Sequence, residues 1–70
     1  MRRFLIVIEK ARGNFSAYSP DLAGCVVTGK TVAEAEKNIY EAIQFHLDGL
    51  KEDRKPLPRS SAVSEYMVFA

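Results

Sequence analysis

The sequence has 70 residues, of which 47% are apolar and 27% charged, with one cysteine and a formal net charge of +1. A chain of this length forms one small domain and buries only about 60% of its unfolded surface, so we expect it to associate with itself or with a partner. The net charge is too small to indicate nucleic-acid binding, and a single cysteine excludes an intrachain disulfide framework and a cysteine-rich zinc site. The first apolar run ends at Glu9, which is too short for a signal peptide or a membrane span, and we expect a cytoplasmic protein.

The N-terminal part of the sequence predicts three strands joined by short turns. Between Phe4 and Lys10, apolar residues occupy both odd and even positions, so both faces of a strand would be apolar. This pattern is typical of a central strand covered on both faces. Arg12-Gly13-Asn14 predicts a hairpin turn into a second strand from Phe15 to Ser19. A tight connection over residues 20–24 then leads to a third strand from Cys25 to Thr28.

Beyond the third strand the period changes to that of a helix. Thr31 and Glu34 form a capping box, and apolar residues at helical spacing predict a helix from Val32 to about Asp53. Val63 to Phe69 predicts a last strand.

The predicted element order is β-β-β-α-β, in a single α+β domain over residues 1–70. Short turns make the first three strands antiparallel, and a right-handed helical crossover returns the last strand beside the doubly apolar first strand. We therefore expect a four-stranded mixed sheet in the order 3-2-1-4, with one long helix on one face. The other face is left uncovered, so we expect a homo-oligomer, dimer or tetramer, formed through that face or through an edge strand.

Cys25 and His46 are the first candidate site. A catalytic cysteine needs a base, and His46 is the single histidine of the sequence. His46 falls on the inner helix face, and nothing in the sequence supplies a third, orienting group. The favoured interpretation is a packed, hydrogen-bonded histidine and a cysteine that serves as a small apolar residue; a Cys/His nucleophile pair is the alternative.

Glu9, Glu41 and Glu65 are candidate metal ligands. Carboxylates from strand, helix and strand hold magnesium in metal-dependent nucleases of the ribonuclease H architecture. Glu41, however, lies about 180° around the helix from the face that meets the sheet. We therefore expect solvated carboxylates, no metal and no cofactor, with a metal nuclease as the least favoured hypothesis.

Pro20 and Asp21 are a candidate functional pair. The structural interpretation is stronger, because proline fixes φ, aspartate hydrogen-bonds the backbone two residues on, and Gly24 accepts a positive φ.

The helix carries the clearest charge pattern. Residues 32–53 contain six acidic and two basic residues, a net charge of −4, whereas the remaining residues carry +5. The null hypothesis is a solvated face; the functional hypothesis is a docking surface for a basic partner, with Phe45 as an exposed aromatic anchor. The candidate partner-binding residues form one stripe on the outer side of the helix: Glu34, Glu41, Phe45, Asp48 and Glu52.

Several short motifs stand at consistent spacing along essentially the whole chain: Tyr18-Ser19-Pro20-Asp21-Leu22-Ala23-Gly24-Cys25, Gly29-Lys30-Thr31, Glu34-Ala35, Asn38, Glu41-Ala42-Ile43, His46-Leu47 and Pro56-Leu57-Pro58. In these residues the sequence resembles the HicB family of antitoxins. The resemblance implies a partial ribonuclease H-like fold and a non-catalytic role, in which the domain binds and masks a small basic messenger-RNA interferase of the HicA type.

The sequence departs from the family pattern at three places. Ala23 stands where a second proline is usual, and Arg54 stands where a helix-ending glycine is usual. The third departure is the C-terminal DNA-binding segment, which this sequence lacks, so no direct DNA binding is expected. A stand-alone oligomeric domain that has lost its toxin partner is the alternative to the antitoxin function.

Overall fold

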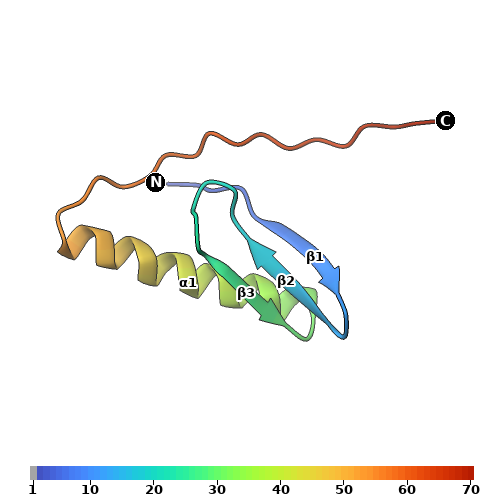
Figure 1. The fold of residues 1–70 in the computed structure, drawn as a ribbon, viewed down its shortest axis with the longest axis horizontal. Coiled ribbons are helices and arrows are strands. Elements are labelled where there is room, and N and C mark those ends of the chain that lie inside the picture. The colour runs from blue at the N-terminus through green and yellow to red at the C-terminus, as the bar shows by residue number, and fades with distance from the viewer. Residues whose placement is uncertain (1) are drawn as a thin grey trace.

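The structure is a computed structural model that describes residues 2–70. It contains three strands, β1 (Val7–Ala11), β2 (Asn14–Tyr18) and β3 (Val26–Gly29), and one helix, α1 (Val32–Glu52). The strands form one antiparallel sheet in the order β1-β2-β3, and α1 crosses one face of it (Figure 1).

The sheet is a meander whose two turns each use a glycine with positive φ. β1 pairs with β2 from Val7 opposite Tyr18 to Ala11 opposite Asn14, across a hairpin turn in which Gly13 has φ 79°. The longer connection to β3 turns at Gly24, which has φ 85°. Left-handed backbone is accessible to glycine without a steric penalty, so these two positions allow the chain to reverse direction.

Helix α1 begins at the predicted capping box. The Glu34 N–H donates to the Thr31 hydroxyl (3.0 Å), and the Glu34 carboxylate accepts from the Lys30 N–H (3.1 Å). The first bond satisfies a backbone donor in the first turn of α1 that has no partner within the helix, and the second ties the residue before the N-cap to that turn.

Helix α1 ends in a Schellman motif. The Lys55 N–H donates to the Leu50 carbonyl (2.9 Å) and the Arg54 N–H to the Lys51 carbonyl (3.1 Å). Arg54 occupies the left-handed position with φ 55°, where helices usually place glycine. The departure from the family pattern at Arg54 therefore leaves the geometry of the helix end intact but puts a side chain in a disfavoured conformation.

The core lies between α1 and the sheet. Its buried apolar residues come from β2, the connection to β3 and the first half of α1: Ala17, Leu22, Cys25, Ala35 and Ile39. Gly29 allows the close approach of β3 and α1, because a Cβ atom there would lie 2.8 Å from Ala35 Cα and 2.9 Å from the Glu34 carbonyl carbon.

The prediction of a four-stranded mixed sheet is wrong. The sheet has three strands, all antiparallel, so neither the order 3-2-1-4 nor the implied partial ribonuclease H-like β-β-β-α-β architecture is present; the fold is α+β overall. Residues 63–69 form no strand and extend away from the sheet (Figure 1). The residues just before this segment are hydrogen-bonded to Asp21 in the turn after β2, so the chain is held at the end of the sheet and not along the β1 edge.

The prediction of a central first strand is also wrong. β1 lies at an edge of the sheet, and it begins at Val7 rather than Phe4. Its partner β2 ends at Tyr18, opposite Val7, so residues 4–6 have no strand to pair with. Phe4 and Ile6 instead pack from one side against the core.

Candidate partner-binding surfaces

Helix α1 lies off-centre on the sheet. It packs most extensively on β3, less on β2 and least on β1. The Asn38 side-chain amide on α1 also donates to the Thr28 carbonyl of β3 (2.9 Å). A groove lies on each side of the helix.

The β3-side groove lies between the Gly24–Val26 segment and the second half of α1. It has a volume of about 640 Å³, and Ala42, Phe45 and Leu50 contribute apolar surface to it. Its charged lining residues are Glu41 and Asp53; none of the residues that line it is lysine or arginine. Phe45 is 83% exposed. This groove therefore combines an exposed aromatic side chain with an acidic rim.

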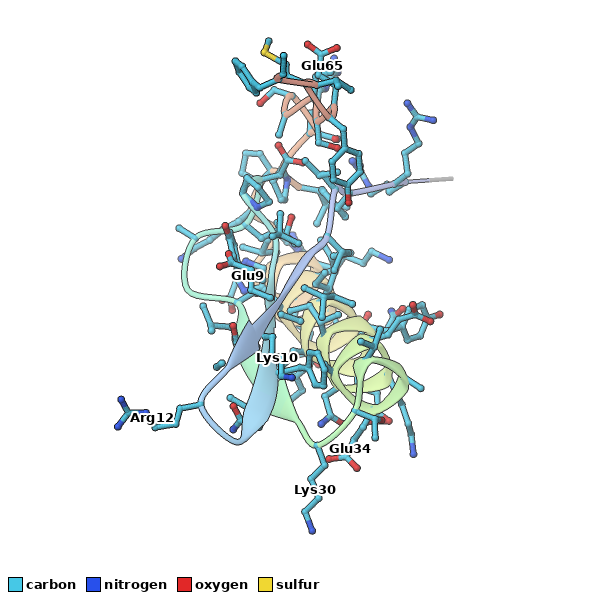
Figure 2. The ribbon with its side chains drawn as sticks, turned by 90° about the vertical axis from the view of Figure 1, so that its right-hand side faces the viewer. Glu9, Lys10, Arg12, Lys30, Glu34 and Glu65 are labelled. Carbon is cyan, nitrogen blue, oxygen red and sulfur yellow. The ribbon has the colours of Figure 1, made fainter. Side chains whose placement is uncertain are left out.

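The predicted stripe on α1 is exposed along its whole length, but its members have different surroundings. Glu41 and Phe45 line the β3-side groove. Glu34 is engaged at the helix N-terminus, where Figure 2 shows it beside Lys30. Asp48 accepts from the Gln44 side-chain amide (3.2 Å), and Glu52 is the last residue of α1. The structure thus brings two of the five residues to one concave surface.

Cys25 and His46 both line the β3-side groove. Cys25 is 8% exposed and belongs to the core cluster, as expected of a cysteine that serves as a small apolar residue. His46 is half-buried, and the hydrogen bonds found among residues 2–70 do not include its imidazole, contrary to the prediction of a hydrogen-bonded histidine. The described residues therefore provide no group that orients the imidazole for catalysis.

The three candidate metal ligands are not brought together. Glu9 lies on β1, Glu41 on α1 and Glu65 on the extended C-terminal segment, far from Glu9 (Figure 2). Within residues 2–70 no group of three or more histidine, cysteine, aspartate or glutamate side chains could hold a metal ion.

Asp21 makes long-range contacts that the sequence analysis did not predict. Its carboxylate accepts from the N–H groups of Ser61 (2.9 Å) and Ala62 (3.0 Å) and from the Ser60 hydroxyl (3.0 Å). The local bond is made by Ser19, whose hydroxyl accepts from the Asp21 N–H (3.3 Å). The hydrogen bonds from Ser61 first, and from Ala62 and Ser60, hold the pKa of Asp21 below its ordinary value.

The β1-side groove was also missed by sequence reasoning. It has a volume of about 760 Å³ and lies between the β1 edge and α1. Arg2, Lys51 and Glu36 contribute its charges. The first apolar run, residues 4–8, could have indicated this groove, because it carries more apolar side chains than one helix can cover. Apolar residues line both of its walls: Phe4, Ile6 and Ile8 on the strand side, and Ile39, Ile43 and Leu47 on α1.

The sheet face opposite α1 is mixed in polarity. Strand alternation and the observed register place Val7, Tyr18 and Val26 in one row and Glu9, Ser16 and Thr28 in the next. A hydrogen bond to Glu9 and the Glu9 charge raise the pKa of Tyr18. This face is less apolar than the first strand alone suggested.

Comparison with known proteins identifies the family. The model of the HicB-like antitoxins of bacterial toxin-antitoxin systems matches residues 4–69. The chain belongs to this family. A UPF0150 protein of Helicobacter pylori is 47% identical over 67% of this chain and 65% of its own length, and a UPF0150 protein of Thermoplasma acidophilum is 36% identical over 89% and 90%, respectively.

An uncharacterised 14.9 kDa protein from the rep-hol intergenic region of Haemophilus phage HP1 is 40% identical over 89% of this HicB-like chain. The match covers 47% of the phage protein, so the chain spans about half the length of that relative. No solved structure matches the chain. Within the described part of this HicB-like chain, no helix has both the length and the hydropathy needed to cross a membrane.

Proposed function

We propose that this chain is a non-catalytic antitoxin module that binds and masks a small basic messenger-RNA interferase of the HicA type. Membership of the HicB-like family supports an antitoxin role. The observation that carries the finer proposal is the β3-side groove, where Phe45 stands in an apolar depression whose charged residues are Glu41 and Asp53.

The physical basis is competition with RNA for the same toxin surface. A protein that grips RNA is basic where the phosphates lie. An acidic rim is complementary to such a surface, accelerates the encounter and becomes less effective as salt screens it. Phe45 supplies apolar area that becomes desolvated at the centre of the contact, where aromatic residues contribute most. Asp48 and Glu52 continue the acidic surface along α1, and Glu34 does so at the other end.

The test is a titration against the basic protein encoded in the neighbouring reading frame or, failing that, a panel of HicA-type toxins. We expect Phe45→Ala to weaken binding by about 2 kcal/mol, roughly 30-fold, at all salt concentrations. We expect Glu41→Lys to weaken binding strongly at low salt and less at high salt. Both side chains are exposed, so thermal melts should be nearly unchanged.

Matched controls lie on the other side of the same helix. Tyr40 is exposed and, like Glu36, lines the β1-side groove. Tyr40→Ala and Glu36→Lys make the same chemical changes there, and we expect them to leave toxin affinity unchanged. Loss of affinity in these two variants, with normal binding by the Phe45 and Glu41 variants, would move the interface to the β1 side.

The alternative proposal is a stand-alone oligomeric domain that has lost its toxin. The exposed apolar C-terminal segment favours self-association but does not distinguish the two, because self-association is compatible with both proposals. Failure of the wild-type chain to bind any tested toxin would favour this alternative. For both, we propose a single domain over residues 1–70 and a cytoplasmic location.

The absence of catalysis is part of the proposal and has its own test. The separation of Glu65 from Glu9 argues against a nuclease site (Figure 2). Cleavage of single-stranded RNA, double-stranded RNA or RNA–DNA hybrid with magnesium or manganese, abolished by Glu41→Gln or Glu9→Gln, would overturn it.

A further inference from the structure

The C-terminal tail, residues 63–69, exposes an unusual amount of apolar surface. Val63, Tyr66, Met67, Val68 and Phe69 are each at least 72% exposed, and Glu65 is the one charged side chain of the tail. Contiguous exposed apolar surface marks an interaction site, and β-branched and aromatic residues favour an extended conformation. The tail therefore has the composition of a segment that is buried by a partner.

The start of the tail is fixed in a way that directs it away from its own domain. Asp21 binds Ser60, Ser61 and Ala62, and Arg2 Nη1 donates to the Pro58 carbonyl (3.4 Å). From this point the tail runs outward and leaves α1 and the sheet behind (Figure 1). The tail consequently leaves the apolar walls of the β1-side groove of its own chain open.

The β1-side groove has a matching size and chemistry. It follows α1 from Glu36 to Lys51, about 22 Å at 1.5 Å per residue. The tail in an extended conformation spans about 20 Å. Arg2 and Lys51 outnumber Glu36 among the lining residues, so the groove has a net positive charge, complementary to Glu65. β1 forms the outer edge of the sheet beside it, with backbone groups unpaired on that side.

We propose that a second copy of this chain covers the β1-side groove with its tail, and that two copies exchange tails reciprocally about a two-fold axis. Each copy has one tail and one groove, so a reciprocal exchange buries both and closes the assembly. The sheet of each chain retains its own three strands, and the partner's tail covers the apolar walls of the β1-side groove. This inference goes beyond the proposed function, and its test needs no toxin.

The test uses two variants that each disable one half of the exchange. Met67→Glu with Val68→Glu disables the tail, because neighbouring residues of an extended segment point to opposite sides and one of the two carboxylates must enter the groove. Tyr40→Lys with Leu47→Glu disables the groove. The groove substitutions create favourable pairs with Glu36 and Lys51 at four-residue spacing, so α1 is preserved. Circular dichroism checks the fold of each variant.

Complementation between the variants distinguishes exchange from any other dimer. Sedimentation at tens of micromolar should show a wild-type dimer and two monomeric variants. An equimolar mixture should restore a dimer that contains one copy of each, visible by native mass spectrometry, because one intact tail still meets one intact groove. Phe45→Lys is the control for Tyr40→Lys: both aromatic side chains are exposed, by 83% and 70%, but Phe45 lies on the other groove, so this variant should remain dimeric.

Three results would overturn the proposal. They are a monomeric wild type, a tail variant that remains dimeric, and a mixture of the two variants that remains monomeric. A wild-type chain that is monomeric alone but buries its tail against a toxin would assign the tail to the toxin instead.

Discussion

Asp21 connects parts of the chain that are distant in sequence. It lies in the turn after β2, yet its carboxylate accepts hydrogen bonds from residues 39 to 41 positions later. The sequence indicated a turn at Pro20-Asp21 because turn chemistry is local. It could not indicate the partners of the carboxylate, since Ser60 and Ser61 are ordinary loop residues whose proximity depends on the length and direction of α1.

We predict that acid releases the start of the C-terminal segment. The pKa of Asp21 is lowered, so its contribution to stability is fully present above the ordinary carboxyl value of about 3.9 and is lost as pH falls through the lower folded-state pKa. Amide resonances of Ser61 and Ala62 should titrate in this range and exchange faster with solvent at its acid end. Asp21→Asn should abolish this titration, whereas Asp48→Asn, at an exposed carboxylate on α1, should leave it unchanged. A titration of the same size in the Asp21 variant would assign the effect to another group.

At the scale of elements, local signals located the helix well and the strands less well. The start of α1 was predicted because Thr31 and Glu34 carry the capping chemistry in sequence. Strand limits depend on partners: β1 starts at Val7 because β2 ends at Tyr18. For the same reason the apolar pattern of residues 63–69 predicted a strand beside the first strand, and this was wrong, because a local pattern does not encode whether a strand partner is within reach.

For the candidate site too, the sequence predicted the local features but not the contacts between distant segments. Helical periodicity placed Glu41 and Phe45 on the exposed side of α1, where the structure has them. It could not reveal that Gly24–Val26 forms the opposite wall of their groove, because that contact depends on where α1 lies on the sheet.

We predict that Arg54→Gly stabilises the domain through the end of α1. Arg54 has φ 55°, a conformation that disfavours side chains by about 1–2 kcal/mol, whereas glycine adopts it freely but has more entropy to lose on folding. The expected net gain is about 0.5–1 kcal/mol in the free energy of unfolding, measured by urea denaturation. Arg59→Gly, at an exposed loop residue outside the helix end, is the control and should give no gain. An unchanged or lower stability for Arg54→Gly would contradict the assigned strain.

For the whole molecule, the position of α1 creates two separate grooves, to which we assign different partners. The β3-side groove has an acidic rim and suits a basic toxin, and the β1-side groove has an apolar floor with mixed charges and suits a second copy. Because the grooves lie on opposite sides of one helix, we expect a dimer formed through the tails to leave both acidic rims accessible. Self-association and toxin binding are therefore compatible in the proposed assembly.

Thermal stability should accordingly depend on protein concentration, and the tail should be the cause. A dimer is favoured over unfolded monomers by mass action, so a hundredfold increase in concentration adds of the order of 1–3 kcal/mol and raises Tm by several degrees. We predict that a chain ending at Ala62 keeps the helix signal and loses this dependence, because residues 63–69 pack on nothing in their own domain. Calorimetric melts of both chains over that concentration range provide the measurement. A shortened chain that is unfolded at every concentration would mean that the tail stabilises its own domain, and a Tm that rises equally in both chains would place the association elsewhere.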